Sequence, residues 1–207
     1  MTIEIAPGAT LWKERLSRAE QEKLLADVLT RIVAAPFYRP TMPKSGKPLS
    51  VEMSNFGSLG WVSDKDGYRY EARHPVTGNP WPAIPEILRA LWRELAAYPA
   101  LPEACLVNLY RPGARMGLHR DADEEAVEAP VLSVSLGDTA RFRFGGASRQ
   151  APVRNLDLAS GDVLLFGGPS RLAFHGVSGI GSGASDLVPG GGRINLTLRR
   201  VRRPLAA

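Results

Sequence analysis

Two of the three histidines in this chain lie beside features that suit a metal ion. His119 is followed two residues later by Asp121, and residues two apart on a β-strand point to the same side. An imidazole and a carboxylate can therefore converge on one ion. His175 lies in Phe174-His175-Gly176-Val177, shortly after a predicted strand. Two histidines and one carboxylate are the ligand set of non-haem Fe(II) oxygenases, which leaves coordination positions open for other ligands.

Each of these signals is weak when it is taken alone. A His-x-Asp pair is common by chance, and an isolated histidine is more often a structural residue than a ligand. The metal hypothesis therefore depends on the residues that accompany the pair.

The segment 193–199 (RINLTLR) alternates apolar and polar side chains, as a β-strand does. Its polar face carries Arg193, Asn195, Thr197 and Arg199. The ordinary interpretation is a half-buried strand with a solvated face. In a barrel, however, one face must line the interior, and arginines there require an anion such as a carboxylate. Asn108 and Tyr110, two apart on an earlier predicted strand, can add hydrogen-bond donors.

The elements that must position these residues change character along the chain. A capping box at residues 17–20 begins one predicted helix, which Pro36 ends, and Pro85 begins a second helix, which Pro99 ends. From residue 104 the apolar period becomes two. The strands are predicted over residues 104–110, 131–136, 140–144, 162–166 and 193–201. This pattern makes the first half helical and loop-rich and the second half a sandwich or barrel.

Two stretches lack a regular pattern. Residues 39–82 form a long irregular stretch that is rich in glycine and aromatic residues, with short hairpins expected, for instance around residues 66–67. Residues 179–192 are expected to form a flexible loop. A long irregular stretch inside a compact domain is often functional.

Composition restricts the class of protein. The chain has 207 residues, of which 44% are hydrophobic and 23% charged, which is typical of one globular domain and not of a disordered chain. Cys105 is the single cysteine, so no internal disulfide can form. We find no run long enough for a membrane helix and no signal peptide, and we expect a cytoplasmic monomer. The formal net charge of +5 favours polyanionic partners, nucleic acid above all.

The motifs, taken in chain order, resemble those of a known family. They are Asn108-x-Tyr110, His119-x-Asp121-x-Asp123, Phe174-His175-Gly176 and Arg193-x-Asn195-x-Thr197-x-Arg199. They resemble the AlkB family of Fe(II)- and 2-oxoglutarate-dependent dioxygenases, most of all its bacterial members that repair alkylated DNA. The resemblance covers about residues 104–201, and residues 61–70 are similar to the family's N-terminal lid. Leu198 departs mildly from the pattern, because an aromatic residue is frequent at that position.

The resemblance implies a mainly β fold with flanking helices (α+β), built on a double-stranded β-helix, or jelly roll. Residues 1–103 would form N-terminal helices and a substrate-recognition lid packed on the core. Residues 104–207 would form the dioxygenase core.

The resemblance also implies a role for each motif residue. The Fe(II) ligands would be His119, Asp121 and His175. The far carboxylate of 2-oxoglutarate would pair with Arg199, helped by Asn108 and Tyr110, in a pocket that Arg193 and Asn195 also line. The substrate base would contact Asp123 and lie between Trp61 and His119, while Tyr68 would contact the phosphate backbone.

The implied reaction is the oxidative demethylation of N-alkylated bases in DNA, of the 1-methyladenine and 3-methylcytosine type. It consumes 2-oxoglutarate and O₂, yields succinate and CO₂, and releases the methyl group as formaldehyde. The substrate would be single-stranded DNA or a base flipped out of a duplex, because poorly paired lesions are the easiest to flip. Three alternatives remain open: the same iron chemistry on RNA, tRNA or protein, a non-catalytic jelly-roll metal-binding module, and a cupin-like metal protein that does not use 2-oxoglutarate.

Overall fold

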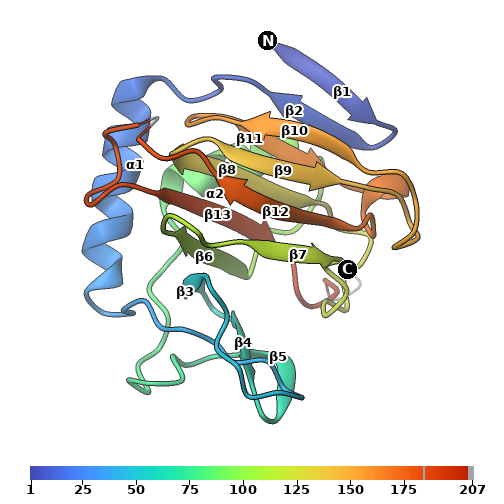
Figure 1. The fold of residues 1–207 in the computed structure, drawn as a ribbon. Helices are drawn as coiled ribbons and strands as arrows, with labels where there is room; N and C mark the ends of the chain where they lie inside the picture. The colour runs from blue at the N-terminus through green and yellow to red at the C-terminus, as the bar shows by residue number, and fades with distance from the viewer. Residues whose placement is uncertain (184, 205–207) are drawn as a thin grey trace.

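A computed structural model describes residues 1–183 and 185–204 of the protein. Two β-sheets face each other, and two helices cover the outer side of the larger sheet (Figure 1). The larger sheet has seven strands in the order β1-β2-β11-β8-β13-β6-β3, and the smaller has four in the order β10-β9-β12-β7. A separate hairpin, β4–β5, projects from one end of the sheets, at the bottom of Figure 1. The two facing sheets form the expected jelly-roll core.

The bounds of the elements are as follows. The larger sheet comprises β1 (Thr2–Ala6), β2 (Ala9–Trp12), β3 (Glu52–Gly57), β6 (Ala104–Tyr110), β8 (Val131–Gly137), β11 (Val163–Phe166) and β13 (Arg193–Arg199). The smaller sheet comprises β7 (Met116–His119), β9 (Ala140–Phe144), β10 (Arg154–Leu158) and β12 (His175–Ile180). The hairpin strands are β4 (Gly60–Asp64) and β5 (Gly67–Glu71), the helices are α1 (Arg18–Ile32) and α2 (Glu86–Leu95), and a short 3₁₀ turn spans Gly168–Ser170.

Both helices begin where the sequence predicts. Ser17 caps α1 through the expected capping box: its backbone N–H donates to Glu20 Oε2 at 2.8 Å, and its hydroxyl accepts from the Glu20 N–H at 3.3 Å. Pro85 precedes the first residue of α2. The apolar stripes of both helices pack on the outer face of the larger sheet, where Trp92 is fully buried. Among the described residues, neither helix is long and apolar enough to cross a membrane.

Successive side chains of β13 alternate between the helix-covered face of the larger sheet and the space between the two sheets. Ile194, Leu196 and Leu198 join the core cluster under the helices. The opposite, polar face of β13 therefore turns toward the smaller sheet. Strand β13 pairs with β6 on one side and β8 on the other, so its polar side chains lie inside the larger sheet and not at its edge.

The N-terminal half contains more strands than the sequence predicts. Residues 39–82 contain β3 and the β4–β5 hairpin, which turns where expected, at Gly67 with a φ of 109°. Strand β3 shows no alternation of apolar and polar residues, because two polar residues, Ser54 and Asn55, are buried side by side. The Ser54 hydroxyl donates to Ala35 O at 2.6 Å, and the Asn55 amide donates to Trp61 O at 3.0 Å. A buried polar pair of this kind hides a strand from a search for apolar periodicity.

The larger sheet is built from both halves of the chain. Strand β2 pairs with β11, and β3 pairs with β6. The expected division between residues 1–103 and 104–207 therefore does not divide the sheet. Within the expected loop 179–192, β12 continues to Ile180, and Ala184 lies outside the described residues.

Candidate active site

A cavity of about 60 Å³ lies between the two sheets. Strands of both sheets line it: β6, β8, β11 and β13 of the larger sheet, and β7, β9, β10 and β12 of the smaller sheet. All the residues that the sequence predicts for metal and cosubstrate binding line it: Asn108, Tyr110, His119, Asp121, His175, Arg193, Asn195 and Arg199.

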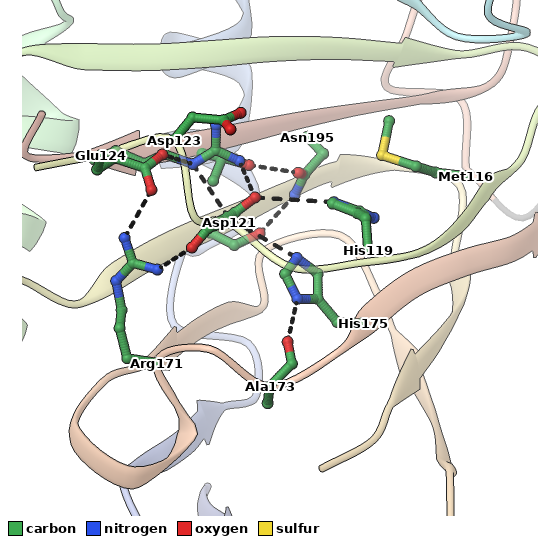
Figure 2. A network of polar contacts seen from close by, with 12 residues as sticks. Met116, His119, Asp121, Asp123, Glu124, Arg171, Ala173, His175 and Asn195 are labelled. Atoms are coloured by element: carbon green, nitrogen blue, oxygen red, sulfur yellow. Dashed lines mark hydrogen bonds and ion pairs between the residues drawn. The ribbon is translucent and has the colours of Figure 1, made fainter. Parts of the chain in front are cut away.

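His119, Asp121 and His175 lie close together in the lining of the cavity (Figure 2). Each offers one possible ligand atom, and these three atoms all lie within 4.8 Å of one another. The Nε2 atoms of His119 and His175 each lie 3.9 Å from an Asp121 carboxylate oxygen. The two histidines come from paired strands, because His175 of β12 lies opposite His119 of β7. Asp121 lies two residues beyond the end of β7, so the pairing of β7 with β12 brings all three residues together.

The donor set fits an iron ion. His119 Nδ1 lies 2.9 Å from the Gly117 carbonyl oxygen, and His175 Nδ1 lies 3.0 Å from the Ala173 carbonyl oxygen. Each Nδ1–H donates to its carbonyl, which leaves the Nε2 lone pair directed at the metal position. Burial, opposed by Asp121, lowers the pKa of His175 to about 4, so this imidazole is neutral and able to coordinate.

The Asp121 carboxylate is held ionised by an arginine. Arg199 donates to both of its oxygens, with Nη2 2.8 Å from Oδ1 and Nε 3.2 Å from Oδ2. Burial alone would raise the pKa of the Asp121 carboxyl, but the Arg199 guanidinium and the two imidazoles hold it well below its usual range. A deprotonated carboxylate in a fixed orientation is what a metal ligand requires.

A buried polar network continues from Asp121 to the hairpin. Glu124 accepts from Arg171 Nη2 at 3.0 Å and from the Tyr70 hydroxyl at 2.5 Å, and the Tyr70 hydroxyl accepts from Arg199 Nη1 at 3.3 Å. Arg171 also donates to the Asp121 backbone carbonyl at 2.7 Å, and Figure 2 shows it beside both acidic residues. The sequence does not predict this network, because nothing in the sequence context of Tyr70, Glu124 and Arg171 distinguishes them from surface residues.

Arg193 differs from Arg199 in having no carboxylate partner among the residues that the structure describes. Its Nη2 donates to Ser135 Oγ at 2.6 Å, and its Nη1 donates to the carbonyls of Leu158 at 2.9 Å and Asp138 at 3.3 Å. Its Nε finds no hydrogen-bond partner in the described chain, and the same holds for Asn108 Oδ1. Burial lowers the pKa of Arg193 to about 10, with Tyr110 and Asp162 opposing that shift, so the side chain stays charged at neutral pH. A buried cation whose hydrogen-bond acceptors are all uncharged is a candidate anion site.

The three predicted substrate residues also lie together. Trp61 Nε1 donates to Asp123 Oδ2 at 2.9 Å, and the rings of Trp61 and Tyr68 stack with centroids 5.5 Å apart. Trp61 packs against the core between the sheets, whereas Tyr68 is 54% exposed. The hairpin thus presents an aromatic pair next to Asp123, which follows the proposed metal ligands His119 and Asp121 in the chain. The stacking of a base between Trp61 and His119 stays a prediction.

Comparison with known proteins gives consistent matches. The model of the 2OG-Fe(II) oxygenase superfamily matches residues 8–199. An alpha-ketoglutarate-dependent dioxygenase AlkB homolog of Caulobacter vibrioides is 55% identical over 202 residues, covering 97% of this chain and 90% of that protein. The alpha-ketoglutarate-dependent dioxygenase AlkB of Escherichia coli K12 is 40% identical over 201 residues, covering 95% and 92%. The solved structure of OsALKBH1 superposes with a TM-score of 0.82 at 32% identity, covering 97% of this chain and 100% of that one.

Proposed function

Because this chain belongs to the 2OG-Fe(II) oxygenase superfamily and is an Fe(II)- and 2-oxoglutarate-dependent dioxygenase, we propose that it demethylates N-alkylated bases in DNA, such as 1-methyladenine and 3-methylcytosine. One observation carries this proposal. The metal ligands lie in a cavity beside an aromatic hairpin that is bonded, through Trp61, to Asp123. Methyl oxidation on the base would release formaldehyde and leave the repaired base.

His119, Asp121 and His175 would hold the iron. Iron and 2-oxoglutarate, when bound, supply an oxidation by O₂ that yields succinate and CO₂. The protein holds the two imidazoles in the coordinating tautomer through the Gly117 and Ala173 carbonyls, and it holds the carboxylate through Arg199. These contacts fix the ligands before the metal arrives.

The two arginines of β13 take different roles in our proposal. Arg199 is already neutralised by Asp121, so its role is to orient that ligand. Arg193 is the uncompensated cation, so it is the better partner for the far carboxylate of 2-oxoglutarate. This reverses the expectation from the sequence, which gave that role to Arg199. Tyr110, Asn108 and Asn195 line the same cavity and would complete the cosubstrate site.

The hairpin would receive the base. Stacking on an aromatic ring stabilises a bound base by about 1–3 kcal/mol, and Trp61 supplies such a ring beside Asp123. Asp123 Oδ2 accepts from Trp61, which leaves Oδ1 to accept from an exocyclic amine of adenine or cytosine. The exposed Tyr68 would contact the phosphate backbone.

The test uses purified protein with Fe(II), 2-oxoglutarate, ascorbate and air. The substrate is a single-stranded DNA oligomer that carries one 1-methyladenine or 3-methylcytosine, with its mass and the succinate formed as readouts. We expect loss of the methyl group in the wild type and no loss in His119→Ala. Asp157→Asn, which changes an exposed carboxylate on β10, serves as the control and should retain activity.

Two other outcomes would contradict the proposal. Succinate formation that is stimulated only by methylated RNA or by protein would move the substrate to that class. Absence of both products from iron-loaded protein would leave a metal-binding jelly roll without this catalysis.

A cytoplasmic location and a monomeric state are also proposals. They rest on the single, buried Cys105, which cannot form an internal disulfide, and on the absence of any sequence signal for association. Cell fractionation and light scattering test them directly.

A further inference from the structure

Ser135 is a buried serine whose only side-chain hydrogen bond in the described chain is to the cosubstrate arginine. It lies on β8, is 2% exposed, and pairs across the sheet with Asn195. Its hydroxyl oxygen accepts from Arg193 Nη2 at 2.6 Å, the shortest of the hydrogen bonds that this guanidinium makes. Ser135 lies behind Arg193, because it is absent from the residues that line the cavity whereas Arg193 is present.

The guanidinium of Arg193 is fixed from two sides. Nη2 is held by the Ser135 hydroxyl, and Nη1 is held by the backbone carbonyls of Leu158 and Asp138. All three acceptors are uncharged, so they fix the position of the cation without neutralising it. The charge therefore remains available to an anion in the cavity.

The metal group that lines the same cavity is fixed as well. The metal ligands are held by their own hydrogen bonds and by the pairing of His119 with His175. Arg193 lies on a paired strand of the larger sheet, and the two histidines lie on paired strands of the smaller sheet, so the fold sets the separation between the metal position and Arg193. A diacid that bridges the metal position and Arg193 must match that separation.

We propose that Ser135 is a positioning residue that sets the length of the acceptable cosubstrate, so that the five-carbon 2-oxo diacid binds better than its six-carbon homologue, 2-oxoadipate. This inference rests on the proposed role of Arg193. A long arginine side chain has several rotatable bonds, and only the Ser135 hydroxyl holds Nη2 in place. Without that hydroxyl, the planar guanidinium keeps only the two Nη1 contacts and can pivot about them, so the position of the anchor becomes less precise.

The test measures equilibrium binding as well as turnover. Mn(II)-loaded protein is titrated under anaerobic conditions with 2-oxoglutarate and with 2-oxoadipate by calorimetry. For Ser135→Ala we expect 2-oxoglutarate to bind at least about tenfold more weakly, which is the lower end of the range for losing one hydrogen bond to a charged group. We expect the ratio of the affinities for 2-oxoglutarate and 2-oxoadipate to fall by a similar factor. In turnover, we expect the KM for 2-oxoglutarate to change more than kcat at saturating 2-oxoglutarate.

Two further serine variants separate positioning from general stability. Ser135→Thr keeps the hydroxyl and should restore both affinities. Ser54→Ala removes an equally buried hydroxyl that donates to Ala35 O at 2.6 Å, away from the cavity, and should change neither affinity. If Ser135→Ala does not fold, Ser135→Cys replaces it, because a thiol fills about the same space and is a much weaker hydrogen-bond acceptor than a hydroxyl. We expect the same loss of 2-oxoglutarate affinity and of diacid preference in that variant.

Wild-type affinity and wild-type diacid preference in a folded Ser135→Ala or Ser135→Cys variant would overturn the inference. Arg193→Ala distinguishes this failure from a failure of the proposed cosubstrate site. If Arg193→Ala abolishes binding while Ser135→Ala does nothing, only the role of Ser135 is wrong. If neither change affects binding, the assignment of Arg193 is wrong as well.

Discussion

Replacing Glu124 by glutamine removes the negative charge from a pair that is almost completely buried. Arg171 and Glu124 are 3.0 Å apart, and their side chains are 4% and 1% exposed. Removing one partner of a buried pair leaves the other charge without compensation, which destabilises a fold by about 3–5 kcal/mol. Glutamine has about the same volume as glutamate and keeps one carbonyl oxygen, so we expect a loss of stability at the lower end of this range, about 3 kcal/mol.

The free-energy change converts into a melting temperature. For a domain of this size, 1 kcal/mol shifts Tm by about 2–4 °C, so Glu124→Gln should lower Tm by about 6–12 °C. Thermal unfolding followed by circular dichroism measures the shift. The matched control is Glu94→Gln, because Arg15 and Glu94 lie 2.6 Å apart but are 31% and 54% exposed. An exposed pair contributes about 0–1 kcal/mol, so this control should shift Tm by less than about 4 °C.

Equal shifts for the two variants would refute the reasoning, because they would show that burial does not decide the effect. A second comparison uses Arg171→Met on the Glu124→Gln background. Removing the orphaned cation should recover part of the lost stability if uncompensated charge is the cause.

Three further predictions concern the site and the scaffold. Trp61→Ala should raise KM for the methylated oligomer about tenfold by loss of stacking, with the KM for 2-oxoglutarate unchanged in the same coupled assay. Gly176→Ala should weaken Mn(II) binding in a calorimetric titration. The added Cβ would lie 2.7 Å from the carbonyl oxygens of Met116 and Gly117, so β7 would have to move away from β12. An unaltered Mn(II) affinity would mean that the two strands accommodate the Cβ without displacing the metal ligands. Ser17→Ala should lower the free energy of unfolding by about 1 kcal/mol in urea, the usual effect of losing a helix cap, and Ser17→Asp should restore it.

The residues of the site could be predicted to the extent that their chemistry follows a local pattern. The alternation of apolar and polar residues along 193–199 predicts the polar face of β13. The two-residue spacing of His119 and Asp121 predicts that their side chains point to the same side. Both are short-range properties of a strand. The structure adds the pairing of β7 with β12, which places His175 opposite His119 and which no local pattern contains.

What could not be predicted depends on partners distant in the chain. Alternation places Arg193 and Arg199 on one face, but it does not say which of them meets a carboxylate. That is decided by Asp121, 78 residues from Arg199. Strand β3 is not predicted from the sequence for a related reason. Its buried Ser54 and Asn55 form hydrogen bonds to Ala35 and Trp61 that exist only in the folded chain.

The sharing of the larger sheet between both halves of the chain limits how the protein can be cut. A fragment that began at residue 104 would keep β11, β8, β13 and β6 but would lose β2 and β3, which cover the two outer strands. It would also lose the helices that bury Leu196 and Leu198. Two unpaired strand edges beside an uncovered apolar face form a template for intermolecular pairing, so such a fragment should aggregate when it is expressed alone. The segment that carries every proposed metal ligand therefore depends on the rest of the chain for its solubility.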